Sequence, residues 1–363
     1  MVRILCLTFV VMCGTSWGQE PAAKPVQGKE EKVVVVEGTS PLNPKDVFNT
    51  PYSADVVGSG DTARRQSRTL PEALKELPGV SVQKTGPGQG SPFIRGWSGY
   101  RNLMLIDGIR LNNSAFREGP NQYWSTVDSY LIDRMDVIRG PSSVLYGSDA
   151  IGGALAIHTL DPEFKPGLNP HSHTVYRYSG GEDSHTARQE FYGNADDFGW
   201  VVGGTYRDYN DISGGRHSPD MKGTGYDQYS GDMKFLYRLS ENSKLVVAVQ
   251  HDRTSEAPRW HSTVDSQSWH GTLPGTDLER DFNQGRDLAY LQYDWKGEGI
   301  VDALKASVSL HRQTESEDRT TTTTVEVNEF IVDTPGAFLQ VGKQTGIGYI
   351  TGGIEVYRDE VSS

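Results

Sequence analysis

The chain has 363 residues, a formal net charge of −12 and only 36% hydrophobic residues, but it contains 41 glycines, 17 tyrosines and 7 tryptophans. An acidic chain without a sustained basic stripe is poorly suited to bind nucleic acid, because neutralising phosphates needs clustered Lys and Arg. A water-soluble enzyme of this length usually carries more Leu, Ile and Val in its core. The composition therefore favours many β-hairpins with aromatic belts.

Residues 1–18 have the features of a cleaved secretory signal peptide: Arg3 precedes a short apolar run at 4–12, and small residues follow. The alternative is a buried N-terminal strand. Both cysteines, Cys6 and Cys13, lie in this segment, so the exported chain would have no disulfide, thiolate metal site or cysteine nucleophile. We expect no cofactor and no metal site. No later apolar stretch suits a transmembrane helix, which leaves a transmembrane β-barrel open.

Residues 19–45 are expected to form a flexible tail, because their first part is rich in Pro, Ala, Lys and Glu. The tail contains one apolar segment with charged flanks, EKVVVVEG at 31–38. One interpretation is an ordinary strand of the following domain. The other is an exposed segment that adds itself to the sheet edge of another protein.

Residues 46–160 are predicted to form a compact α+β domain. A capping box at 69–72 with proline in the first turn predicts a helix over 70–77. Asp107-Gly108 is a strong hairpin-turn dipeptide. Residues 112–124 lack periodicity and are expected to form a surface loop. The predicted strands are 80–83, 93–95, 103–106, 109–111, 135–138 and 154–157.

From about residue 170 onward, apolar and polar residues alternate in segments of roughly ten residues. Met233, Phe235 and Tyr237 share one face, for example, while Lys234 lies on the other. Short connections alternate with long ones at 210–227, 254–285 and 316–345, as in an outer-membrane barrel; a soluble β-sandwich is the alternative. About eight strands are expected, near 174–179, 186–194, 199–209, 228–239, 243–253, 286–296, 302–315 and 346–358.

No motif argues for an enzyme. The glycine-rich stretch at 147–153 lacks the Lys-Ser/Thr of a phosphate-binding loop, contains Asp149 and leads into a strand. Gly96-Trp-Ser-Gly99 misses the nucleophile elbow by one position. The pair His171 and His173 is a weak metal hint. The glycines instead suit sharp reversals and close backbone contacts, which side chains would prevent.

Five short motifs follow one another between residues 93 and 153. They are Phe93-Ile-Arg-Gly96, Leu105-Ile-Asp-Gly108, Val137-Ile-Arg-Gly-Pro-x-Ser143, Leu145-Tyr-Gly147 and Ala150-Ile-Gly-Gly153. In this order they resemble the plug domain of TonB-dependent outer-membrane receptors. The residues to which the resemblance gives a structural role are Arg95, Gly96, Asp107, Gly108, Arg139, Gly140, Pro141, Tyr146, Gly147, Gly152 and Gly153.

The resemblance implies a plug inside a 22-stranded barrel in the outer membrane of a Gram-negative-type bacterium. It makes 31–38 similar to the TonB box, with Glu31, Lys32, Val33, Val34, Val35 and Val36 binding the partner TonB. It implies active uptake of a ferric siderophore, haem, cobalamin or a similar metal chelate, with outer-membrane lipid as the other partner. Substrate-binding candidates on the plug and on the long loops are Trp97, Tyr100, Arg101, Phe116, Arg117, Asn121, Gln122, Tyr123, Trp260, His261, Trp269 and His270.

The chain departs from the family pattern in its strand number. About eight strands over 170–363 fall short of 22, and an eight-stranded barrel has no room for a domain inside it. We therefore expect a fragment with an open, curved sheet and an unpaired edge at its last strand. Two other interpretations are a remnant that binds partners without transport and a secreted soluble β-rich binding protein.

Overall fold

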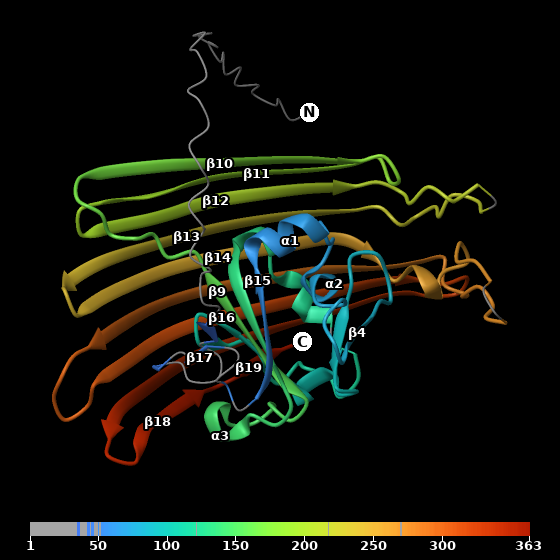
Figure 1. The fold of residues 1–363 in the computed structure, drawn as a ribbon. Coiled ribbons are helices and arrows are strands. Elements are labelled where there is room, and N and C mark those ends of the chain that lie inside the picture. The colour runs from blue at the N-terminus through green and yellow to red at the C-terminus, as the bar shows by residue number, and fades with distance from the viewer. Residues whose placement is uncertain are drawn as a thin grey trace, which may run out of the picture. The chain divides into compact units, whose positions relative to one another are not determined.

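The computed structural model describes residues 35–36, 42–43, 45–46, 50, 52–120, 122–216, 218–268 and 271–363. The predicted signal peptide and most of the predicted tail lie outside these residues. The described part contains an α+β region, here called the plug (residues 53–159), followed by a large antiparallel sheet, here called the wall (residues 168–362) (Figure 1). This confirms the predicted fold class, although the wall has ten strands in the described residues where about eight were expected.

The plug is built on a five-stranded mixed sheet in the order β3-β8-β9-β6-β7, in which β6 and β9 are parallel. A separate hairpin joins β4 to β5. The strands are β3 (Ser53–Gly58), β4 (Val80–Gln83), β5 (Ser91–Ile94), β6 (Asn102–Ile106), β7 (Ile109–Arg110), β8 (Ile132–Arg139) and β9 (Gly153–Thr159). The helices are α1 (Ser59–Arg65), α2 (Leu70–Ala73) and α3 (Ser143–Tyr146), with 3₁₀ turns η2 (Gly99–Arg101), η3 (Gln122–Thr126) and η4 (Ser129–Leu131).

The wall contains ten strands among the described residues, joined in sequence order. They are β10 (Leu168–Ser179), β11 (Ser184–Ala195), β12 (Phe198–Tyr209), β13 (Tyr226–Ser240), β14 (Ser243–Pro258), β15 (Glu279–Lys296), β16 (Ala303–Thr320), β17 (Val325–Thr345), β18 (Gly348–Tyr357) and β19 (Glu360–Ser362). Over the described chain the sheet stays open, with β10 at one edge and with β18 and β19 both paired to β17 at the other.

The plug packs one face of its sheet directly on the wall. Strands β6 and β9 are mostly apolar and buried on both faces, as expected for strands covered on two sides, and β8 is buried from Met135 to Ile138. One face, with Met104 and Leu155, forms a continuous core with Leu236, Leu288 and Phe338 of the wall. The other face packs around Leu103, Ile138, Tyr146 and Ala154. The wall is therefore part of the plug's hydrophobic core.

Several local predictions hold and others fail. Strand β4 matches its prediction, and the Asp107-Gly108 turn has φ of 49° and 92°, as a type I′ hairpin turn requires. The helix predicted over 70–77 was too long: after Ala73 the backbone forms i to i+3 hydrogen bonds and tightens into turns before Pro78.

The long loop predicted over 316–345 was wrong, because β16 and β17 extend through most of it. Pro335 suggests a break in this strand, since proline cannot donate a ladder hydrogen bond. In the structure the Arg358 amide donates to the Pro335 carbonyl, so this side of Pro335 faces the interruption between β18 and β19. The amide hydrogen that Pro335 lacks would therefore point to a place where no neighbouring strand continues to accept it.

The prediction of a surface loop over 112–124 was only partly right: the segment is largely irregular and Ser114, Arg117 and Glu118 are exposed, but its aromatic residues are not. Phe116, Tyr123 and Trp124 are buried between the plug and the wall, and Trp124 is among the largest fully buried side chains. No helix of the described chain is long and apolar enough to cross a lipid bilayer.

Candidate functional site

The plug aspartate of the Asp107-Gly108 turn is bonded to the wall. Asp107 Oδ2 accepts hydrogen bonds from Tyr290 Oη at 2.5 Å and Lys234 Nζ at 3.4 Å, from strands β15 and β13. Within the plug it also accepts from the Thr159 hydroxyl and amide, at 2.6 and 3.0 Å. The turn that closes the β6–β7 hairpin is therefore fastened to two wall strands.

The charge of Asp107 is stabilised by these contacts. Burial by itself raises the pKa of this carboxyl, but the Lys234 ammonium and the hydrogen bonds from Thr159 and Tyr290 outweigh burial. The net pKa lies below its ordinary value, so Asp107 stays ionised at neutral pH.

A second plug aspartate, Asp128, makes a stronger connection deeper in the interface. Asp128 caps η4 by accepting from the Tyr130 amide at 2.9 Å. Its carboxylate also accepts from Arg207 and, at 2.5 Å, from Thr205 Oγ1, both on β12, and Arg188 of β11 lies 3.6 Å away. Burial raises the pKa of Asp128, but the two guanidinium groups outweigh it and lower the pKa to about 2.

No local pattern in the sequence marks the Asp128 cluster. Asp128 lies in a turn-like segment, and Arg188 and Arg207 occupy ordinary polar positions of alternating strands. Only the docking of the plug brings these three side chains together, at sequence separations of 60 to 79 residues. The one signal in the sequence joins two strands: each of two adjacent wall strands has an arginine at an inward position, which suggests a buried anion between them.

At the other end of the interface, two plug segments predicted to contact substrate lie side by side. The Arg101 guanidinium stacks over the rings of Trp97 and Tyr100, with 5.5 and 4.9 Å from its carbon to the ring centroids. It also donates to the Glu118 carbonyl at 3.0 Å and pairs with the Glu118 carboxylate. Trp97 and Tyr100 are exposed, so this group presents aromatic and charged surface to solvent.

Three further candidates of the plug lie deeper than expected. The rings of Phe116 and Tyr123 pack 5.5 Å apart, and Phe330 of β17 covers Tyr123 at 6.1 Å. Arg117 reaches the wall and donates to Glu315 of β16 at 3.0 Å. Burial lowers the pKa of Arg117, but Tyr123 and Glu315 outweigh it and raise the pKa. Phe116 and Tyr123 are core residues that cannot meet a substrate without movement.

The long loop after β14 supplies two candidates next to the plug. Trp260 begins the 3₁₀ turn η5 (Trp260–Ser262) and donates from Nε1 to the Lys222 carbonyl at 2.9 Å. His261 Nδ1 lies 2.7 Å from the Thr85 carbonyl of the plug. Asn121, Trp269 and His270 lie outside the described residues, and of Gln122 only its place in η3 is described. No cluster of three potential metal ligands occurs in the described chain.

The glycine-rich stretch that closes the plug is a set of tight backbone contacts. The Gly140 amide bonds to the Gly152 carbonyl at 2.8 Å. A Cβ at Gly152 would lie 2.4 Å from Asn102 Oδ1 and 2.5 Å from Trp97 Cβ, so no other residue fits there without displacing its neighbours. Two arginines hold this glycine-rich stretch in place. Arg139, at its start, pairs with Asp55 at 2.7 Å, and Arg110 of β7 donates to the Tyr146 carbonyl at 2.6 Å.

The remaining motif residues lie in the same part of the plug. Arg95 has φ of 51° and Gly96 has φ of 84°, so the chain turns sharply after β5, and Gly147 ends α3 with φ of 71°. The Arg95 guanidinium lies against Gly140, where a Cβ would come 2.8 Å from Nη1. Pro141 is exposed and Gly153 is buried at the start of β9.

The valine segment at 31–38 is described only at its centre. Val35 and Val36 form the two-residue strand β1 (Val35–Val36), which pairs antiparallel with β2 (Lys45–Asp46). Glu31, Lys32, Val33 and Val34 lie outside the described residues. Val35 and Val36 therefore have the extended conformation that addition to a sheet edge requires.

The outward side chains of the wall form an apolar band between two aromatic rows. Phe198 stacks on Phe235 at 5.9 Å near the end with the short turns. Toward the other end, the Tyr206 hydroxyl donates to Asp227 at 3.0 Å. Tyr229 and Tyr237 of β13 belong to opposite rows and are eight residues apart, or about 26 Å along the strand. This spacing matches the apolar band of outer-membrane barrels, about 25 Å tall.

An internal domain bonded to an open antiparallel sheet with an aromatic-edged apolar face defines the class of plugged outer-membrane β-barrel proteins. The family model "TonB-dependent Receptor Plug Domain" matches residues 46–154. The iron-regulated outer membrane virulence protein of Vibrio cholerae is 30% identical over 312 residues, covering 82% of this chain and 44% of that protein. The vitamin B12 transporter BtuB of Vibrio vulnificus is 36% identical over 118 residues, covering 32% of this chain and 19% of BtuB.

Solved structures share the fold. The copper transporter OprC superposes with a TM-score of 0.70 at 16% identity, over 85% of this chain and 46% of OprC. The ferric enterobactin receptor PfeA of Pseudomonas aeruginosa gives a TM-score of 0.64 at 16% identity, over 87% of this chain and 50% of PfeA. The chain belongs to the family of TonB-dependent receptors and is an outer-membrane protein. The chain spans about half the length of the Vibrio cholerae virulence protein, of which the match covers 44%.

Proposed function

We propose that this protein takes part in the active uptake of a scarce metal chelate, such as a ferric siderophore, haem or cobalamin, through the outer membrane. The main support is the plug itself, an internal domain whose core is completed by the wall and whose aromatic, arginine-bearing end is exposed. The names of the relatives, an iron-regulated virulence protein and a vitamin B12 transporter, agree with such a cargo.

The proposed binding surface for the cargo lies at the end of the interface with the long loops. Its exposed members are Trp97, Tyr100 and His261, with Arg101 held between the aromatic rings and Glu118. Flat aromatic rings and a guanidinium suit a chelate with aromatic or anionic groups. In this proposal Arg117 and Trp260 form the floor and side of the surface.

The proposed source of energy is TonB, which would pair with the valine segment by strand addition. The test deletes residues 33–36 from the protein in its native host and measures accumulation of radiolabelled ferric chelate and cobalamin. Loss of uptake with unchanged binding at the cell surface is expected. Deletion of residues 22–25, in the same tail, is the matched control and should leave uptake unchanged. Retained uptake after deletion of 33–36 contradicts the assignment of this segment.

A further inference from the structure

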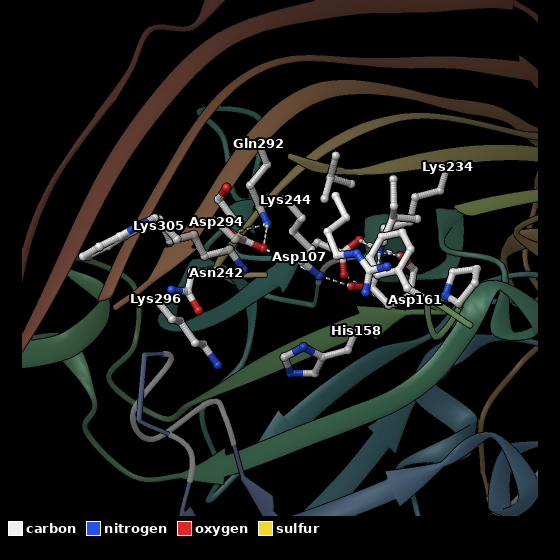
Figure 2. A pocket seen from close by; sticks show the side chains of 18 of the residues that line it. Asp107, His158, Asp161, Lys234, Asn242, Lys244, Gln292, Asp294, Lys296 and Lys305 are labelled. Carbon is white, nitrogen blue, oxygen red and sulfur yellow. Dashed lines mark hydrogen bonds and ion pairs between the residues drawn. The ribbon is translucent and has the colours of Figure 1, made fainter. Parts of the chain in front are cut away.

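A cavity of about 690 Å³ lies between the plug and the wall, at the end that carries the short turns (Figure 2). The β13–β14 turn closes one side, with Glu241 and Asn242. The plug contributes Asp107 and His158, and the segment that joins the plug to the wall contributes Asp161. This cavity is at the opposite end of the interface from the proposed cargo surface.

Four consecutive wall strands each place one lysine in this cavity. Strand alternation turns these four positions toward the plug, and all four line the cavity in Figure 2. They are Lys234 of β13, Lys244 of β14, Lys296 of β15 and Lys305 of β16. In all, six Lys or Arg and five Asp or Glu line the cavity, so it is slightly positive in a chain whose net charge is −12.

Two of the lysines are held by carboxylates of the plug and of its connecting segment. Lys234 pairs with Asp107 and Asp161, and Lys244 Nζ lies 2.5 Å from Asp161 Oδ2. Lys244 also lies 3.7 Å from Asp294 of the neighbouring strand. The carboxylates of Asp107 and Asp161 thus already bind two of the four lysines.

The other two lysines, Lys296 and Lys305, form no ion pair with any described residue. Lys244 and Lys305 are both in register with Asp294, on its two sides, which places them two strand spacings apart, or about 10 Å. An anion with two or three charged groups can span such a distance. The cavity therefore contains unpaired positive charge beside cations that already bind carboxylates.

We propose that the lysine row 234/244/296/305 is a binding site for anionic groups of the cargo, carboxylates or phosphates, on its way between plug and wall. The proposal rests on the proposed uptake function. In the resting arrangement Asp107 and Asp161 fill the half of the row at Lys234 and Lys244, and Lys296 and Lys305 remain open. A plug displacement that withdraws the two aspartates frees all four lysines along one path. The cargo class that fits is an anionic chelate.

The direct test is protection of the lysines from acetylation. Protein purified from outer membranes in a neutral detergent is treated with an amine-acetylating reagent, with and without ferric citrate or inorganic phosphate, and acetylation at each lysine is read by mass spectrometry. Binding of either probe should slow acetylation of Lys296 and Lys305 roughly threefold or more at saturation. Stronger protection by ferric citrate indicates a chelate, and stronger protection by phosphate indicates a phosphate group. Unchanged rates with both probes overturn the site.

Lys165 is the internal control, because it is exposed and pairs with Glu163 outside the cavity. Its acetylation should not respond to either probe. In cells, the variant K296Q/K305Q should slow transport of an anionic chelate while surface binding stays unchanged, and K165Q should change neither. If the unaltered protein transports nothing, the proposed function fails, whereas the protection result still decides whether the lysine row binds anions.

Discussion

The two ends of the plug–wall interface are built in opposite ways. Toward the short turns and the middle, buried aspartates meet wall cations: Asp107 with Lys234, and Asp128 with Arg188 and Arg207. At the other end, Arg101 stacks on Trp97 and Tyr100, whose rings remain exposed, and the plug meets the wall there through the half-exposed Arg117 and its partner Glu315. Buried ion pairs are costly to break, whereas exposed ones contribute little. The plug is therefore joined to the wall by buried charges toward the short turns, and at the other end it presents an exposed aromatic group beside the Arg117–Glu315 pair.

The largest effect should come from removing the charge of Asp128. Asp128→Asn leaves the buried Arg207 guanidinium without its carboxylate partner, while Arg188 keeps Asp232 and Glu190, and breaking a buried pair in this way costs about 3–5 kcal/mol. Urea unfolding in detergent micelles, followed by tryptophan fluorescence, to which the buried Trp124 contributes, measures the loss. The control is Asp133→Asn, an exposed aspartate of the same plug. Equal losses in the two variants would show that the Asp128 cluster does not hold the plug.

The glycine turn behind the exposed end should give the next effect. In Gly152→Ala the new methyl group meets Asn102 and Trp97 within 2.5 Å, and overpacking of this kind costs up to about 3 kcal/mol. Gly119→Ala is the matched control, since no atom lies within 4 Å of the place that its new methyl group would take. The same unfolding measurement compares them. A G152A protein as stable as G119A would mean that the turn relaxes without cost.

Acid should selectively loosen the end that is joined to the wall by buried charges. The pKa of Asp128 falls from 3.8 to about 2 on folding, which is worth about 2 kcal/mol of stability at neutral pH. Because the folded pKa is the lower one, this stability is present above pH 4 and disappears as the pH falls toward 2. Unfolding free energies measured between pH 5 and 2 should therefore drop more steeply for the unaltered protein than for D128N. Parallel curves would contradict this assignment.

The sequence was sufficient where a local rule decides the structure. Alternation in residues 228–239 predicted a strand with Phe235 and Lys234 on opposite faces, and Asp107-Gly108 predicted its hairpin turn. It failed where a distant segment decides. Residues 316–345 were predicted to form a long loop, but β16 and β17 extend through most of them. Pro335 fits within β17 because its side without an amide hydrogen faces the gap between β18 and β19, which are later in the chain.

The predictions for the candidate site also held where sequence neighbours make the contacts and failed where distant segments make them. Trp97, Tyr100 and Arg101 are close in sequence, and they form one exposed group. Phe116 and Tyr123 were predicted to be exposed because their segment lacks periodicity, but both are buried, with Phe330 of β17 against Tyr123. The arginine partners of Asp128 lie at least 60 residues away in the sequence. The alternation of their strands requires only a polar side chain at these positions and does not specify arginine. Such contacts depend on how the plug docks, which no local pattern encodes.

The smallest effect should come from the exposed end, and it completes the comparison with Asp128. Glu118→Ala removes the carboxylate partner of Arg101, but the Glu118 side chain is 74% exposed. An ion pair in water contributes less than about 1 kcal/mol, because solvent screens it and both side chains lose freedom. Unfolding of E118A should thus match that of the unaltered protein within about 0.5 kcal/mol. A loss near that of D128N would mean that the Arg101–Glu118 pair stabilises the plug itself, and the exposed aromatic group would then be part of the scaffold, with no freedom to meet a cargo.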